Sequence, residues 1–265
     1  MVQVFELGEY TIFTQVEGAG RPLLLLHSYW GSHVLFDQLA KAFSSKMKVI
    51  RIDLPGHGKS GTPPLDYTFE KFSTILFELL IKLDVREKVS VIGHSMGGYA
   101  ALAFAAKYPG RIASLVLMHS PVKESDIKSI KLRNREGWLL QNGKKDLMLQ
   151  VTIPSNFAPE NLDKMEKALI LLVQSSNQVT VEGALGSIYA INHRGNSLTT
   201  LKEAKYPILI IIGKYDNVYS ADEQLNDANK IANAEVLMLN HSGHLGFMEE
   251  EELVIKKMDK FLSND

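Results

Sequence analysis

The chain has 265 residues, of which 45% are hydrophobic, and its 29 basic and 30 acidic side chains leave a net charge of −1. This much apolar material can fill one large core, and the near-zero charge gives no global field that would attract nucleic acid or an anionic membrane surface. The chain has no cysteine, which excludes disulfides, thiol catalysis and cysteine-ligated metal.

The first residues, Met1–Leu7, lack the basic start and long apolar core of a signal peptide. No uninterrupted apolar run is long enough to span a bilayer. We therefore expect a soluble, cytoplasmic protein without a membrane span.

The predicted elements begin with an antiparallel hairpin, residues 2–7 and 10–17, that turns at Gly8-Glu9. Short apolar runs then recur, and helical segments separate most of them, which favours buried parallel strands joined by crossovers. The runs are Leu23–Leu26, Val49–Asp53, Val89–Ile92, Ile112–Met118, Ile208–Ile212 and Glu235–Leu239.

Three helices are predicted around these strands. Apolar residues recur at helical spacing from Thr68 to Leu83. An alanine-rich helix runs from Met96 to about Tyr108 and ends at Pro109-Gly110. The last helix, Glu249–Leu262, begins with four glutamates and carries its lysines later, which matches the helix dipole.

The interval from Pro121 to Ala204 breaks the alternation, because it shows helical stretches such as Met165–Val173 and no strand. We interpret it as an insertion between two strands of the sheet.

The most informative segment is Val89–Ala100, in which an apolar strand runs into Gly93-His94-Ser95-Met96-Gly97 and then into a helix. A strand that turns into a helix within a residue or two places its apex in a strained, positive-φ conformation. The two glycines let the arms of the turn approach each other, so the Ser95 hydroxyl is left projecting at the tip. This geometry presents a nucleophile.

Here the chain resembles the α/β-hydrolase superfamily, and the likeness extends over most of its length. Four further segments support it, namely Leu23–Gly31, Arg51–Ser60, Gly213–Asp216 and His241–His244. The resemblance implies an α/β-hydrolase fold with a mostly parallel eight-stranded sheet flanked by helices. It also implies a core domain of residues 1–120 and 205–265, with residues 121–204 as an inserted helical cap, or lid.

A serine hydroxyl is a weak nucleophile, so Ser95 requires a base and the base requires an orienting carboxylate. We predict His244 as the base, because it follows the last strand after a short loop; His241 is its nearest rival. Asp216, delivered by the loop after Ile208–Ile212, is the predicted acid, and Asp126 is the alternative. The order serine, acid, histidine is that of the hydrolases resembled.

Acyl transfer places negative charge on a carbonyl oxygen, which backbone amides stabilise. The predicted donors are the amides of Met96 and Tyr29. The family's commoner loop has glycine where this chain has Ser28, so the choice between Tyr29 and Ser28 stays open. Aromatic or imidazole groups predicted to contact the substrate are Trp30, His119 and Trp138.

These residues predict a serine hydrolase that cleaves a small carboxylic ester without a metal or a cofactor. Serine at position 95 argues against dehalogenases and epoxide hydrolases, which use a carboxylate nucleophile. The same scaffold also hosts lactonases, carbon–carbon bond hydrolases, perhydrolases and a menaquinone-pathway lyase, although that lyase commonly carries arginine where this chain has Tyr99. A hydrolase-like small-molecule receptor or signalling protein remains the alternative of another class.

Overall fold

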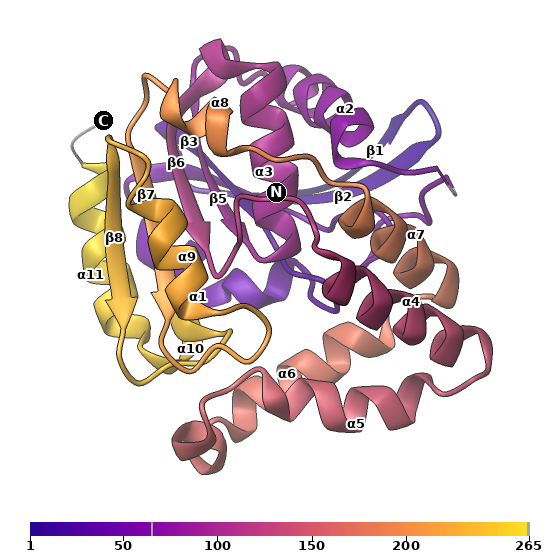
Figure 1. Ribbon diagram of the computed structural model, residues 1–265. Coiled ribbons are helices and arrows are strands. Elements are labelled where there is room, and N and C mark those ends of the chain that lie inside the picture. Colours follow the sequence, from indigo (N-terminus) through magenta and orange to yellow (C-terminus); the bar gives the residue numbers. More distant parts are fainter. Residues whose placement is uncertain (65, 264–265) are drawn as a thin grey trace.

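The computed structural model describes residues 1–64 and 66–263, and these residues build one eight-stranded sheet between two layers of helices (Figure 1). The strands lie in the order β1-β2-β4-β3-β5-β6-β7-β8. Their bounds, from β1 to β8, are Val2–Leu7, Tyr10–Glu17, Arg21–Leu26, Met47–Ile52, Val89–His94, Ile112–Met118, Ile208–Gly213 and Ala234–Leu239. The predicted hairpin and the six predicted strands are confirmed.

The sheet is mostly parallel, and its antiparallel pairs lie at one edge. The β1–β2 and β2–β4 pairs are antiparallel, whereas the pairs from β3 and β4 through to β7 and β8 are parallel. Every residue of β5 and β7 is buried, as expected for strands covered on both faces. Apolar residues in these strands therefore follow one another, instead of alternating with polar residues.

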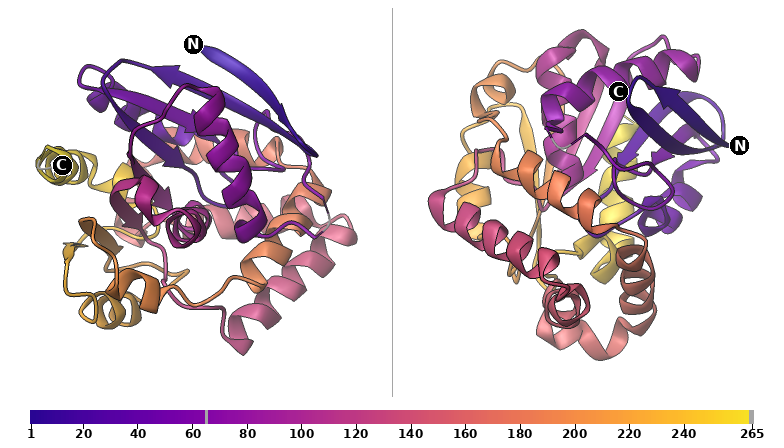
Figure 2. Two further views of the ribbon diagram at one scale, coloured as in Figure 1. Left: turned by 90° about the horizontal axis from the view of Figure 1, so that it is seen from above. Right: turned by 90° about the vertical axis from the view of Figure 1, so that its right-hand side faces the viewer.

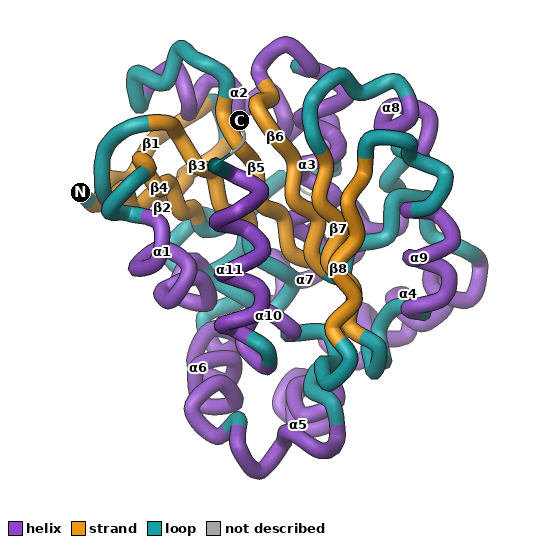
Figure 3. The backbone as a smooth tube through the Cα atoms, turned by 90° about the vertical axis from the view of Figure 1, so that its left-hand side faces the viewer, coloured by secondary structure: helices purple, strands orange, loops and turns teal. Residues whose placement is uncertain are grey.

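Helices cover both faces of the sheet. Helices α1 (Asp37–Phe43) and α11 (Glu251–Leu262) lie on one face, and α2 (Phe69–Lys82) and α3 (Met96–Lys107) lie on the other (Figure 3). Thr68 caps α2 by accepting a hydrogen bond from the Lys71 amide, which explains where this helix begins. The remaining short elements outside the inserted segment are η1 (His33–Phe36), which leads into α1, η2 (Pro109–Arg111), which follows α3, and α9 (Ala221–Ala228).

Between β6 and β7 the described chain forms helices and no strand, as predicted. Helices α4 to α7 gather at the end of the sheet where the parallel strands terminate, and α8 lies at the opposite end (Figures 1 and 2). The bounds are Ile127–Gln141 for α4, Lys145–Ser155 for α5, Pro159–Lys164 for the 3-10 helix η3, Glu166–Asn177 for α6, Val181–Asn192 for α7 and Leu198–Lys202 for α8.

The prediction of one helix over Glu249–Leu262 is wrong at its start. The structure has a short helix α10, Gly246–Glu249, and α11 begins at Glu251. Glu250 lies between them with φ −123° and ψ 49°. Its carboxylate accepts hydrogen bonds from the His241 amide and the Ser242 hydroxyl, so it is tied to the preceding loop and interrupts the helix. No helix among residues 1–64 and 66–263 combines the length and the apolar character that a membrane crossing requires.

Candidate active site

Ser95 occupies the turn between β5 and α3 in a strained backbone conformation, with φ 51° and ψ −115°. Three hydrogen bonds hold this conformation. The Ser95 amide donates to the Met118 carbonyl on β6 at 2.9 Å. The Ser95 carbonyl accepts from the Gly98 amide and from the Ser120 hydroxyl, each at 2.9 Å. The serine is thus fixed from β6, from α3 and from the loop after β6.

The glycines beside Ser95 allow α3 to pack directly on the sheet. A Cβ atom on Gly97 would lie 2.0 Å from the Leu26 carbonyl oxygen at the end of β3. A Cβ atom on Gly93 would lie 2.5 Å from the Cα atom of Gly98. Both distances are far below van der Waals contact, so a side chain at either position would push the turn away from the sheet.

The predicted acid and base form a buried pair. His244 Nδ1 donates to Asp216 Oδ2 at 2.9 Å, and Asp216 Oδ1 accepts from the amides of Val218 and Tyr219 at 2.8 and 3.0 Å. Burial alone would raise the pKa of Asp216, but His244 and His119 beside it hold that pKa well below its ordinary value. Asp216 is therefore a carboxylate, and its bond fixes which ring nitrogen of His244 carries the proton.

The backbone of His244 is held from two sides. The His94 ring donates from Nε2 to the His244 carbonyl at 2.8 Å. The His244 amide donates to the Asn156 carbonyl, at the end of α5, at 2.7 Å. The inserted helices therefore contact the loop that carries the predicted base.

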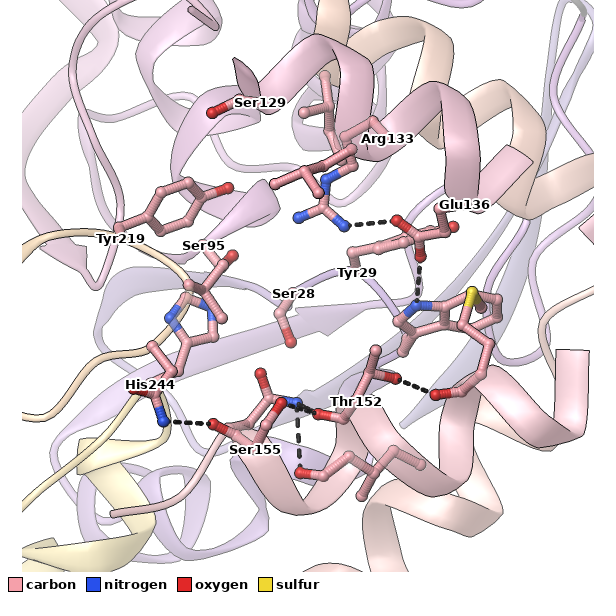
Figure 4. Close-up of a pocket in the computed structure, with 18 of the residues that line it drawn as sticks. Ser28, Tyr29, Ser95, Ser129, Arg133, Glu136, Thr152, Ser155, Tyr219 and His244 are labelled. Atoms are coloured by element: carbon pink, nitrogen blue, oxygen red, sulfur yellow. Dashed lines mark hydrogen bonds and ion pairs between the residues drawn. The ribbon is translucent and has the colours of Figure 1, made fainter. Parts of the chain in front are cut away.

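A cavity of about 390 Å³ lies between the sheet domain and the helices α4 to α7. Ser95 and His244 both line it, and Figure 4 shows them side by side on its wall. Ser28, Tyr29 and Trp30 also contribute to the wall from the loop after β3. This volume suits a small organic molecule.

The amides of Tyr29 and Met96, the predicted oxyanion donors, have no hydrogen-bond acceptor within the part of the chain that the structure describes. Unsatisfied amides near a nucleophile are available to a ligand oxygen. The Ser28 amide also has no acceptor among the described residues, so it is an equal candidate, whereas the Ser28 carbonyl accepts from the Gly31 amide and from the His27 ring.

The model of the alpha/beta hydrolase fold family matches residues 21–251. The chain belongs to this family.

Two curated relatives of this alpha/beta hydrolase cover most of its length. The dihydrolipoyllysine-residue acetyltransferase component of an acetoin cleaving system from Pseudomonas putida is 31% identical over 99% of the chain, and the match spans 66% of that relative. Lipase 1 of Psychrobacter immobilis is 30% identical over 87% of the chain and 73% of the lipase. The chain thus spans about two thirds to three quarters of these relatives.

Among solved structures, a thermophilic esterase from Thermogutta terrifontis matches with a TM-score of 0.93. The match covers 100% of this alpha/beta hydrolase and 98% of the esterase at 24% identity. At this identity the likeness supports the fold.

Asp126 and His241, the alternatives to Asp216 and His244 in this alpha/beta hydrolase, lie outside the cavity wall. The His241 side chain is 71% exposed, and its Nδ1 lies 3.1 Å from the Glu160 carboxylate. Asp126 is exposed and caps α4, because its side chain accepts from the Ser129 amide at 2.6 Å. Neither residue lines the cavity.

Two predicted substrate contacts are not in the cavity wall. The side chain of Trp138 is 60% exposed, because the cavity-facing stripe of α4 runs through Ser129, Leu132, Arg133, Glu136 and Leu139. His119 is fully buried, with Nδ1 at 3.5 Å from Asp216 Oδ2 and Nε2 at 3.2 Å from the Gly246 amide nitrogen. It contacts Asp216 rather than the cavity. Trp30, the third, does line the cavity.

His119, Asp216 and His244 bring three potential metal-ligand atoms within 4.8 Å of one another. Their hydrogen bonds describe this cluster better than a metal site does. Both carboxylate oxygens accept from protein donors, and each imidazole has a partner in the backbone or in the carboxylate. These hydrogen bonds hold the Asp216 carboxylate and orient the His244 ring.

Sequence reasoning missed several groups that shape this site. Ser120 follows a predicted strand and His94 lies within the Ser95 turn, but their hydrogen bonds join parts of the chain that only the fold brings together. Arg133 and Glu136 carry a local signal, since opposite charges three residues apart on a helix can pair. That signal does not distinguish a solvated pair from one that faces a cavity.

Proposed function

We propose that this alpha/beta hydrolase is a serine esterase that cleaves a small carboxylic ester through an acyl-enzyme. The observation that carries the proposal is the arrangement around one cavity. Ser95 on its strained turn and His244, paired with the buried Asp216 carboxylate, line the same wall. Nucleophile, base and orienting acid are the three groups that acyl transfer requires.

In the proposed reaction the Ser95 hydroxyl attacks the ester carbonyl while His244 Nε2 takes the hydroxyl proton. Asp216 stabilises the resulting imidazolium through Nδ1, and the amides of Met96 and Tyr29 donate to the oxyanion. Collapse expels the alcohol, which receives the proton from His244. Water then attacks the acyl-enzyme in the same way, with His244 taking its proton and returning it to Ser95, and the carboxylic acid is released. These steps use no metal or cofactor.

The helices α4 to α7 act in this proposal as the cap predicted for residues 121–204. Their cavity-facing side chains form the wall opposite Ser95, so they determine which esters fit. The names of the relatives agree with ester chemistry, since a lipase and an esterase are among them.

The proposal is tested by turnover of a short-chain nitrophenyl ester together with labelling by a fluorophosphonate probe. Ser95→Ala is expected to abolish both. His244→Ala should lower kcat by roughly 10⁴-fold, because an unassisted serine is a poor nucleophile. Asp216→Asn should lower kcat by roughly 10³- to 10⁴-fold, because the base loses its orientation.

Matched controls come from the rival residues. His241→Ala and Asp126→Asn make the same chemical changes outside the cavity and should leave turnover within about twofold, as surface substitutions usually do. Unchanged turnover in Ser95→Ala would remove the nucleophile assignment. A wild-type protein that binds esters but neither turns them over nor reacts with the probe would favour a receptor instead.

A further inference from the structure

Arg133 is placed in the cavity by α4. Its side chain keeps 23% of its surface accessible, and Figure 4 shows its guanidinium pointing into the cavity. One of its nitrogens, Nη1, donates to Glu136 Oε2 at 2.8 Å. The other oxygen of Glu136 accepts from Trp30 Nε1 at 3.2 Å, so this carboxylate is shared between two donors.

Most donors of Arg133 remain available. A guanidinium carries five N–H groups, and among the described residues Glu136 is its only hydrogen-bond acceptor. Arg194 also lines the cavity but differs, because it donates to the Lys123 carbonyl, the Ser125 hydroxyl and the Ile191 carbonyl. Arg194 therefore braces the chain, whereas Arg133 presents free donors to the cavity.

The cavity wall also carries more positive than negative side chains. Arg133, Arg135 and Arg194 are its arginines, and Glu136 is the one acidic residue among the described residues that line it. Burial opposes the charge of Arg133, but Glu136, Tyr219 and Tyr29 outweigh that effect and raise the pKa of Arg133. The guanidinium is thus a permanent cation in a partly dry site, where an anionic partner is favoured.

We propose that Arg133 binds a carboxylate of the substrate, so that the preferred substrate is an ester that carries a free carboxylate away from the bond that is cleaved. A planar carboxylate matches the guanidinium fork with two parallel hydrogen bonds. Arg133 comes from α4 and Ser95 from the sheet domain, so one molecule in the cavity reaches both. This inference rests on the proposed esterase function and specifies its substrate class.

The test uses matched pairs of esters. Monoethyl esters of the straight-chain dicarboxylic acids from succinate to suberate are compared with ethyl esters in which the free carboxylate is replaced by an amide. Proton release in a pH-stat gives kcat/KM for each. The ratio of the charged to the neutral ester, taken at the best chain length, is expected to exceed one in the wild type and to fall roughly 10- to 100-fold in Arg133→Met.

Two variants sharpen the comparison. Lys131→Met removes a positive charge from the same helix at a residue that does not line the cavity, and it should keep the wild-type ratio. Arg133→Lys keeps the charge without the fork and should give an intermediate ratio. If Arg133 only positioned Glu136 and Trp30, its loss would change both esters alike, and the unchanged ratio would overturn the inference.

A binding measurement separates this inference from the esterase proposal. Ser95→Ala cannot form an acyl-enzyme, so calorimetric titration of this variant with adipate reports the carboxylate site alone. Adding Arg133→Met should weaken adipate binding by roughly tenfold or more. Equal binding in both variants, or none in either, refutes the Arg133 site. Absent turnover and absent labelling of Ser95 would instead refute the esterase.

Discussion

His27 joins the loop after β3 to the loop after β4, and its hydrogen bonds require a neutral ring. Its Nδ1 donates to the Ser28 carbonyl at 2.8 Å, and its Nε2 accepts from the Leu54 amide at 2.8 Å. The side chain is fully buried. Burial lowers the pKa of His27 from 6.5 to about 4, although the Asp53 carboxylate opposes this shift.

This shift makes the protein less stable in acid. Between the two pKa values, about 6.5 unfolded and about 4 folded, the unfolded chain binds a proton that the folded chain does not. The free energy of unfolding therefore falls as the pH decreases through this window, and the His27 contribution is fully present above it. Between pH 7 and pH 4.5 these pKa values give a loss of about 2 kcal/mol from His27 alone.

Urea unfolding of the wild type and of His27→Gln at both pH values measures this contribution. Glutamine does not titrate, and its side-chain oxygen can still accept from the Leu54 amide. Other groups, including His57, whose burial lowers its pKa to about 3, lose stability in acid in both proteins. The wild type should lose about 2 kcal/mol more than the variant. Equal losses would refute the assignment of His27 as a buried neutral group.

Two further predictions concern residues that support the site, His119 beside Asp216 and Gly97 in the turn of Ser95. His119→Phe removes the imidazole that lies 3.5 Å from Asp216 Oδ2 and helps to hold the pKa of Asp216 low, so it should lower kcat roughly tenfold with KM unchanged; a raised KM with unchanged kcat would instead restore His119 as a substrate contact. Gly97→Ala places a Cβ 2.0 Å from the Leu26 carbonyl oxygen and should destabilise the fold by roughly 3 kcal/mol in urea unfolding. Gly110→Ala, whose Cβ meets nothing within 4 Å, is its control, and similar effects of the two would contradict the packing argument.

The sheet and the serine turn could be predicted because their signals are local. A strand buried on both faces must be an apolar run, and β7, Ile208–Gly213, has no polar side chain to obscure it. The turn at Ser95 needs small residues at fixed offsets, and those glycines are visible in the sequence. Such requirements depend on a few neighbouring residues, so they do not need the fold.

The cavity wall could not be predicted in the same way. Hydrophobicity suggested Trp138 as a pocket residue, yet its side chain is 60% exposed while the charged Arg133 faces the cavity. In a core helix the apolar stripe identifies the buried face. A helix that covers a polar cavity can direct charged groups inward, so the apolar stripe no longer identifies the inner face of α4.

Glu249 shows why the support of His244 was also missed. A glutamate at the start of a terminal helix is fully accounted for by the helix dipole. In the structure its Oε1 accepts from the Gly243 amide and its Oε2 from the Ala158 amide, each at 2.8 Å, and Ala158 lies 91 residues away in sequence. One carboxylate thus joins the loop that carries His244 to the inserted segment. Because the Asn156 carbonyl also accepts from the His244 amide, the segment that walls the cavity also fixes the position of the proposed base, His244. A displacement of that segment would therefore change substrate fit and proton transfer together.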